Sequence, residues 1–312
     1  LEPGHGWDYE VLEVITTNPS IEAAELGIEI TNSYLDHAVS YGTEIDITLS
    51  VIDLTKIDLL DQAISELSKS FLNASLEISP KLGISVNNSL RFGKSPNPLW
   101  DSQMSDIGDF AATLGLYEPN LQIDSNNLVD AMNNVLISQV TGPATRSATG
   151  LSIYFPELSE YAKEDYIAIP GLDDWKNLLL EHFSLQENIP ENKKANIVTD
   201  TFEPSYSLDD DGLSITAQFD IAVEENLTES VIYYGIPEDD GSILFIGEEP
   251  GEISNDGSGL VEGFYDLSAL TMSDGIDTVY AYSEITTDES YLYLDIPLAY
   301  LSPEDVEADS EQ

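Results

Sequence analysis

Few residues in this 312-residue chain can do chemistry, because the sequence contains no cysteine and only three histidines. Without cysteine the chain can form no disulfide bond, no thiolate metal site and no thiol nucleophile. The histidines are His5, His37 and His182, and no two of them have the spacing of a metal-binding pair. His37 and His182 lie in helical patterns, so we expect them to be packing or surface residues.

Serine and acidic residues offer further candidates. Gly150-Leu151-Ser152-Ile153-Tyr154 lacks the second glycine of the Gly-x-Ser-x-Gly nucleophile elbow, so we expect Ser152 to be a buried, hydrogen-bonded hydroxyl. The turn Asp209-Asp210-Asp211-Gly212 could offer oxygen ligands to calcium, although it lacks the full EF-hand loop and Asp-Gly is common in hairpins. Alternating tyrosines could bind carbohydrate or could be ordinary strand residues: Tyr280, Tyr282, Tyr291 and Tyr293. We therefore assign no catalytic residue and no metal ligand within the chain.

Acidic residues dominate the charge, with 59 Asp and Glu against 10 Lys and Arg and a formal net charge of −49. Nucleic acid is a poor partner for such a chain, because phosphate binding needs clustered Lys and Arg. The acids are spread through every segment, which predicts a solvated anionic surface. High salt would relieve the self-repulsion, since the Debye length is about 3 Å at 1 M. We expect no membrane span and an extracellular or cell-surface location.

The elements that must position these residues are helices and buried strands. An uncharged run of β-branched and aromatic residues, 148–156, predicts a strand buried on both faces. A second strand over 45–51 alternates apolar and polar residues, and Asp53 behind it can cap a helix. Further helices are expected over 21–39, 104–116, 125–140 and 172–183, with a short element near 82–86 in a long connection. This alternation predicts a layered α/β domain.

Three of the expected helices have a predicted inward face. On the first helix this face comprises Ile21, Ala24, Ile28 and Leu35. On the helix after Asp53 it comprises Leu54, Ile57, Leu60, Ile64, Leu67 and Phe71. On the last helix it comprises Trp175, Leu178, Leu179 and either His182 or Phe183.

The pattern changes to short β runs after a polar, proline-containing segment at 187–194, which suits a domain boundary. These runs lie at 213–221, 231–236, 243–246, 279–282 and 291–296. Asp-Gly pairs typical of hairpin turns separate them, at 211–212, 240–241, 256–257 and 274–275. Short strands with such turns and no helical stretch predict a β-sandwich.

Three stretches together resemble the clostripain family of cysteine peptidases, relatives of caspases, gingipains and legumain. They are Glu2-Pro3-Gly4 with Gly6-Trp7-Asp8-Tyr9, then Thr48-Leu49-Ser50-Val51-Ile52-Asp53-Leu54, and then Gly150-Leu151-Ser152-Ile153-Tyr154-Phe155-Pro156. Their order and spacing carry the match, together with the downstream helix that contains Trp175-Lys176-Asn177-Leu178-Leu179. Later stretches resemble the family's C-terminal β domain: Gly263-Phe264-Tyr265-Asp266, Ser273-Asp274-Gly275 and Ile296-Pro297-Leu298-Ala299-Tyr300. The resemblance covers nearly the whole sequence.

The resemblance implies a caspase-like layered α/β domain over residues 1–186 that is incomplete at its N-terminus. A linker over 187–200, an all-β sandwich domain over 201–303 and an acidic tail over 304–312 follow. In the family a histidine and an Asp-Ala-Cys nucleophile turn precede the Glu-Pro-Gly segment, which here begins at the first residues. We therefore expect the C-terminal part of a longer polypeptide, with the N-terminal half as its partner and source of the Cys-His dyad. The resemblance also adds support for calcium.

Asp8 is the substrate-binding residue that the resemblance implies. In the related folds, the stretch after the nucleophile strand lines the primary specificity pocket, where a carboxylate could pair with both guanidinium nitrogens of a substrate arginine. The alternative is an acidic residue in an ordinary turn. Trp7 and Tyr9 could wall the pocket or fill the core.

Two functions remain open at this point. The first is the C-terminal part of a clostripain-like cysteine endopeptidase, which cleaves peptide or protein substrates after basic residues in the full protein and is inactive as this chain alone. The second is a non-catalytic secreted or cell-surface binding protein on a degenerate peptidase scaffold. The upstream sequence distinguishes them, because an Asp-Ala-Cys turn and a preceding histidine would support the enzyme.

Overall fold

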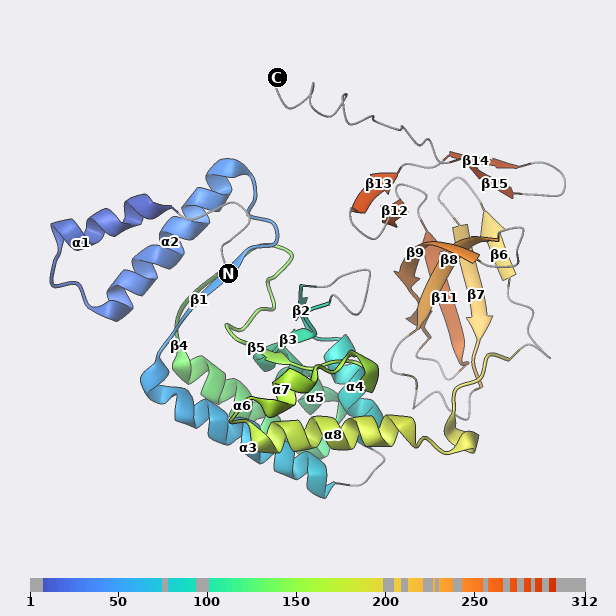
Figure 1. The fold of residues 1–312 in the computed structure, drawn as a ribbon, viewed down its shortest axis with the longest axis horizontal. Helices are drawn as coiled ribbons and strands as arrows, with labels where there is room; N and C mark the ends of the chain where they lie inside the picture. The colour runs from blue at the N-terminus through green and yellow to red at the C-terminus, as the bar shows by residue number, and fades with distance from the viewer. Residues whose placement is uncertain are drawn as a thin grey trace. The chain divides into compact units, whose positions relative to one another are not determined.

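The structure, a computed structural model, describes residues 8–74, 78–93 and 101–198 and shorter stretches beyond them (Figure 1). The shorter stretches are 205–208, 213–220, 227, 230–237, 243–254, 258–265, 270–273, 278–281, 284–287 and 292–295. The chain divides into two compact units, Leu1–Asn192 and Lys193–Gln312, and this division lies inside the predicted linker at 187–200. The expected acidic tail at 304–312 lies outside the described residues. No helix of the described part is long and apolar enough to cross a membrane.

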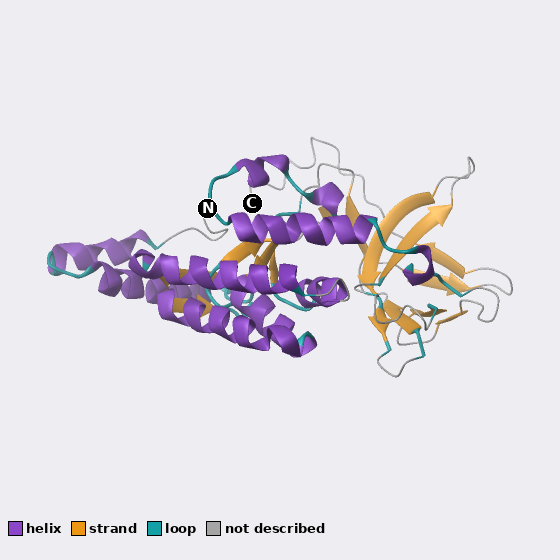
Figure 2. Ribbon diagram, turned by 90° about the horizontal axis from the view of Figure 1, so that it is seen from below, coloured by secondary structure: helices purple, strands orange, loops and turns teal. Residues whose placement is uncertain are grey.

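The first unit combines helices with short strands, so the mixed α/β class is confirmed. Its elements are η1 (Tyr9–Leu12), α1 (Glu13–Thr17), α2 (Ala23–Tyr41), β1 (Thr48–Ile52), η2 (Leu54–Lys56), α3 (Ile57–Asn73), α4 (Ser79–Asn87), β2 (Arg91–Phe92), β3 (Met104–Asp106), α5 (Ile107–Tyr117), η4 (Pro119–Leu121), α6 (Gln122–Val135), β4 (Leu136–Thr141), β5 (Ser152–Tyr154), η5 (Ser159–Tyr161), α7 (Glu164–Ala168), α8 (Asp173–Glu187) and η6 (Glu191–Lys193). Figure 2 shows its long helices lying alongside one another.

Helix α3 forms because Asp53 starts the preceding turn and an apolar stripe follows. The Asp53 side chain accepts a hydrogen bond from the backbone N–H of Thr55 at 3.0 Å, so Asp53 is a cap as predicted, although of the 3-10 turn η2 that leads into α3. The stripe is buried at Leu60, Ile64, Leu67 and Phe71, where α3 packs against α6 and α8. Leu54 lies in η2 and is exposed, so the inward face begins later than predicted.

Aromatic rings fill the centre of this core, around Trp175 of α8. The Trp175 ring meets Phe110 of α5 and Phe155 edge-on, at centroid distances of 5.8 and 5.6 Å. Its indole N–H donates to the carbonyl oxygen of Tyr154 at 3.1 Å, so the buried polar group is satisfied. The predicted inward face of α8 is confirmed, and both His182 and Phe183 are buried.

Helix α2 packs against the β1–β4 ribbon through two small residues, a threonine and a tyrosine. Its buried residues are Gly27, Thr31, Tyr34 and Ala38. The predicted inward face is wrong at Ala24 and Ile28, which are exposed. Ile21 precedes the helix, whereas Leu35 is partly buried and packs against the core cluster of the helix and the ribbon, as predicted. A Cβ on Gly27 would lie 2.7 Å from Val51 Cγ1, so only glycine lets the helix come this close to β1. Thr31 and Ser138 hydroxyls hydrogen-bond across the contact at 2.7 Å.

Two predicted helices are each replaced by a strand at one end. The helix expected over 104–116 is wrong at its start, because Met104–Asp106 is β3 and pairs antiparallel with β2 and β5. The helix expected over 125–140 is wrong at its end, because α6 stops at Val135 and Leu136–Thr141 is β4, paired antiparallel with β1. The apolar residues of β4 also fit a helical spacing, so only the pairing with β1 decides the conformation. The expected strand at 148–156 is the short β5, with Ile153 and Tyr154 buried on its two faces.

The second unit is all β in its described residues, with antiparallel pairs throughout. Its strands are β6 (Ser205–Leu208), β7 (Leu213–Gln218), β8 (Val231–Pro237), β9 (Ile243–Pro250), β10 (Glu252–Ile253), β11 (Leu260–Tyr265), β12 (Leu270–Ser273), β13 (Thr278–Ala281), β14 (Glu284–Thr287) and β15 (Leu292–Asp295). The four predicted Asp-Gly turns lie outside the described residues. The strands on either side of each turn nevertheless pair with one another, as β6–β7, β8–β9, β10–β11 and β12–β13.

Candidate functional site

The Asp8 carboxylate is held by hydrogen bonds from two elements. Asp8 precedes η1, and its Oδ1 accepts the backbone N–H of Glu10 at 3.0 Å. Its Oδ2 accepts the hydroxyl of Ser33, in the middle of α2, at 2.6 Å. Asp8 is half-buried and Tyr9 is 66% exposed, so Tyr9 does not fill the core. Trp7 lies outside the described residues.

The surroundings of Asp8 keep it ionised. The Ser33 hydrogen bond is the main cause that lowers the pKa of Asp8 below its usual value, and the Glu10 amide and the charge of His37 add to it. A half-exposed carboxylate that stays ionised can bind a cation. Among the described residues each of its oxygens accepts one donor, which leaves acceptor capacity for a ligand.

A hydrolytic triad consists of a serine, a histidine and a carboxylate, and Ser33, His37 and Asp8 are residues of these types. Their hydrogen bonds, however, do not connect them in the order of a triad. In such a triad the histidine lies between the serine and the carboxylate. Here Ser33 bonds directly to Asp8, while the His37 ring lies against Tyr41 at a centroid distance of 4.7 Å. The arrangement orients a carboxylate and does not activate a serine. His5 lies outside the described residues.

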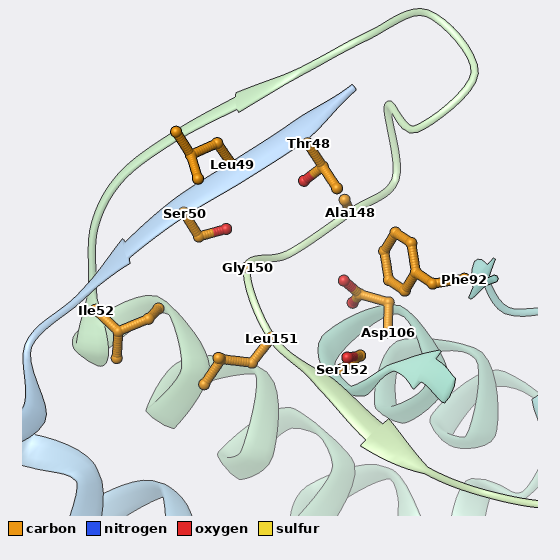
Figure 3. Close-up of a pocket in the computed structure, with 10 residues that line it drawn as sticks. All are labelled: Thr48, Leu49, Ser50, Ile52, Phe92, Asp106, Ala148, Gly150, Leu151 and Ser152. Carbon is orange, nitrogen blue, oxygen red and sulfur yellow. The ribbon is translucent and has the colours of Figure 1, made fainter. Parts of the chain in front are cut away.

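A cavity of about 250 Å³ lies between β1 and the segment that leads into β5 (Figure 3). The residues that line it are Thr48, Leu49, Ser50, Ile52, Phe92, Asp106, Ala148, Gly150, Leu151 and Ser152. Ser152 is exposed and lines this cavity, so the expectation of a buried hydroxyl is wrong. Gly150 has a φ of +126°, and a Cβ there would lie 2.9 Å from Leu136 Cδ1.

Asp106 is a buried residue of the cavity wall, and its carboxylate accepts hydrogen bonds from two separate segments. Its Oδ1 accepts the backbone N–H groups of Gly108 and Asp109 at 3.2 and 3.0 Å, which caps α5. The hydroxyl of Thr149 also donates to Oδ1, and the Thr149 amide donates to Oδ2 at 2.8 Å. Burial raises the pKa of Asp106, while these hydrogen bonds oppose the rise. Four donors already engage the carboxylate, so we assign it a structural role.

His182 and Ser79 form a second Ser–His contact, inside the core. The hydroxyl of Ser79 lies 2.9 Å from His182 Nδ1, and both residues are buried. Burial lowers the pKa of His182 to about 4, so the ring is neutral at pH 7. Its Nε2 has no hydrogen-bond partner among the described residues. A substrate cannot reach this pair, so it is part of the core, as predicted for His182.

The described residues contain no group of three or more His, Asp or Glu side chains that could hold a metal ion. The Asp-rich turn at 209–212, a candidate calcium site, lies outside these residues.

Two residues of these sites were missed by sequence reasoning. Asp106 could have been found, because an Asp directly before an apolar helical pattern is a common N-cap. Ser33 gave no signal, since it meets Asp8 across 25 residues of chain and sits in a helix of mixed polarity.

Comparisons with known proteins give one match. The clostripain family matches residues 1–189, more than half of the chain, a range that includes Asp8, Ser33 and all the cavity-lining residues. No curated protein and no solved structure matches the chain. The resemblance found in the sequence is thus confirmed over residues 1–189, and the chain belongs to the clostripain family, a family of cysteine peptidases.

Proposed function

We propose that this chain is the part of a clostripain-type cysteine endopeptidase that recognises a basic substrate residue, with Asp8 as the recognition carboxylate. The observation that carries this proposal is the ionised, half-exposed Asp8, fixed by Glu10 and Ser33 in a chain of the clostripain family. A planar guanidinium pairs well with such a fixed carboxylate. Tyr9 is exposed beside Asp8 and can form a wall of the proposed pocket. The same role for Trp7 rests on the resemblance alone, because Trp7 lies outside the described residues.

The reaction needs a thiolate that these 312 residues cannot supply, because they contain no cysteine. We propose that an upstream Cys-His dyad in the same polypeptide supplies it. The histidine would deprotonate the thiol for attack on the scissile carbonyl, and backbone N–H groups would hold the oxyanion. The contribution of this chain is to bind the basic side chain and to support the sheet.

The finer architecture belongs to the same proposal. The first unit would be part of a caspase-like domain, and the second a β-sandwich. Supporting the sandwich, β8 and β11 belong to different sheets, and Ile232 of β8 packs onto Gly263 of β11. The extracellular or cell-surface location and a calcium ion in the second unit are also proposals, based on the acidic composition and the Asp-rich turns.

A binding protein on a degenerate peptidase scaffold is the second candidate, favoured by the absence of cysteine from the chain. The upstream sequence separates the two functions. A histidine and an Asp-Ala-Cys turn there support the enzyme, and their absence supports the binding protein.

The test uses the full-length protein and this chain alone, with peptides that end in arginine, lysine or alanine before the scissile bond. The full-length protein should cleave the basic peptides, and this chain alone should cleave none. Asp8→Asn should reduce cleavage after arginine, because it removes the charge that faces the guanidinium. Glu10→Gln is the matched control, since it removes one charge two residues away and keeps the amide that Asp8 accepts. Equal rates for both variants would refute the role of Asp8.

A further inference from the structure

Ser33 is the residue outside the Asp8 turn that fixes the Asp8 carboxylate. Its hydroxyl donates to Asp8 Oδ2 at 2.6 Å, while the Glu10 amide donates to Oδ1 at 3.0 Å. The amide belongs to the same short turn as Asp8 and moves with it. Ser33 belongs to α2, so its hydrogen bond connects the turn to a separate, longer element.

Helix α2 is a firm support for this hydrogen bond. Its buried residues Gly27, Thr31, Tyr34 and Ala38 pack on the β1–β4 ribbon, and Thr31 bonds to Ser138 of β4 at 2.7 Å. Ser33 lies between Thr31 and Tyr34 in sequence and is half-buried. The carboxylate is therefore fixed relative to the β1–β4 ribbon as well as to its own turn.

We propose that Ser33 is a positioning residue that orients the Asp8 carboxylate for pairing through both oxygens, and that it thereby sets a preference for arginine over lysine. The inference rests on the proposed recognition role of Asp8. One donor on each oxygen holds the plane of the carboxylate and leaves one further acceptor direction on each.

The chemistry of the two basic side chains explains the preference. A guanidinium is planar and presents two parallel N–H groups, so it gains most from a carboxylate with a fixed plane. An ammonium is a compact charge with rotatable donors and depends less on that plane. Loss of the Ser33 hydroxyl should therefore weaken arginine recognition more than lysine recognition.

The titratable neighbours of Asp8 are few among the described residues. His37, one turn after Ser33 on α2, is the group whose charge acts on Asp8, and Tyr9 and Glu10 lie on its own turn. The Ser33 bond is the largest cause of the lowered pKa of Asp8. Removal of this hydrogen bond should raise the pKa of Asp8. Arginine binding should then be lost at a higher pH as the solution is acidified.

The experiment compares Ser33→Ala, Ser33→Thr and Asp8→Asn in the full-length protein. For Ser33→Ala we expect the ratio of kcat/KM for arginine over lysine peptides to fall on the order of 10-fold, as for loss of one hydrogen bond to a charged group. Ser33→Thr keeps the hydroxyl and should restore most of the ratio. An unchanged ratio in Ser33→Ala, with Asp8→Asn impaired, would overturn the inference and leave the role of Asp8 standing. If Asp8→Asn also cleaves arginine peptides at the unaltered rate, both the inference on Ser33 and the proposed role of Asp8 are refuted.

A second measurement needs no catalysis. NMR titration of the Asp8 carboxyl in this chain should show a higher pKa in Ser33→Ala than in the unaltered chain, and a value close to the unaltered one in Ser33→Thr. Alanine favours helix, so Ser33→Ala should fold. An identical Asp8 titration in all three chains would show that the Ser33 bond does not form and would overturn the inference.

Discussion

The buried His182 makes the stability of the first unit depend on pH in a way that can be measured. Burial lowers the pKa of His182 from 6.5 to about 4, because its ring is buried beside Phe155 and Phe183. In the unfolded chain the ring takes up a proton below about pH 6.5, whereas in the folded chain it stays neutral until about pH 4. Unfolding therefore binds a proton between these values. The stabilisation is fully present above pH 6.5 and is lost as the pH falls towards 4.

The magnitude follows from the two pKa values. At about 1.4 kcal/mol per pH unit, the interval from 6.5 to about 4 corresponds to about 3–4 kcal/mol. This loss would be a large fraction of the free energy of unfolding of an ordinary domain, about 5–15 kcal/mol.

The assay is urea unfolding followed by tryptophan fluorescence at pH 7.5, 6.5, 5.5 and 4.5. Trp7, Trp100 and Trp175 are the only tryptophans, and all three lie in the first unit, so the signal reports on that unit alone. His182→Gln removes the titration and keeps a polar group for Ser79. Both chains share the same carboxylates, so the difference between their curves isolates the histidine. A difference that stays constant from pH 6.5 to 4.5 would refute the lowered pKa of His182.

Two further predictions concern packing and charge. Gly27→Ala should destabilise the contact between α2 and β1 by about 1–2 kcal/mol despite the higher helix propensity of alanine, because the new Cβ would lie 2.7 Å from Val51 Cγ1. Amide hydrogen exchange in α2 measures this, and Val51→Ala in the same chain should relieve it; equal protection with and without Val51→Ala would contradict the packing. Raising NaCl from about 0.1 to about 1 M should raise the urea midpoint of the first unit, because the Debye length shortens from about 10 to about 3 Å around a chain of net charge −49. A flat or falling midpoint would show that charge repulsion does not limit stability.

Local sequence patterns predicted an element correctly where residues close together in the sequence determine it. The stripe of α3 and the inward face of α8 repeat with the helical period, and each is buried as predicted, apart from Leu54. The Asp53 cap depends on a contact with Thr55, two residues away, so the sequence contains both partners. The Asp-Gly pairs of the second unit likewise separate strands that pair with one another.

Local patterns failed where a partner distant in sequence decides the conformation. Residues 136–140 fit a helix, and only pairing with β1 makes them a strand. The inward face of α2 includes Gly27 and Thr31 besides Tyr34, because the helix approaches the ribbon closely at Gly27, so large apolar residues alone do not mark the contact.

The sequence by itself determined the family, the absence of a thiol nucleophile, the change from an α/β to an all-β pattern, and Asp8 as the recognition candidate. Only the tertiary structure placed the Ser33 hydroxyl on Asp8, the Thr149 hydroxyl on Asp106 and Ser79 on His182. The physical reason is the same in each case. A hydrogen bond between side chains 25 to 103 residues apart has no period or motif in the sequence, and it forms only when the packing of other residues brings its two atoms together.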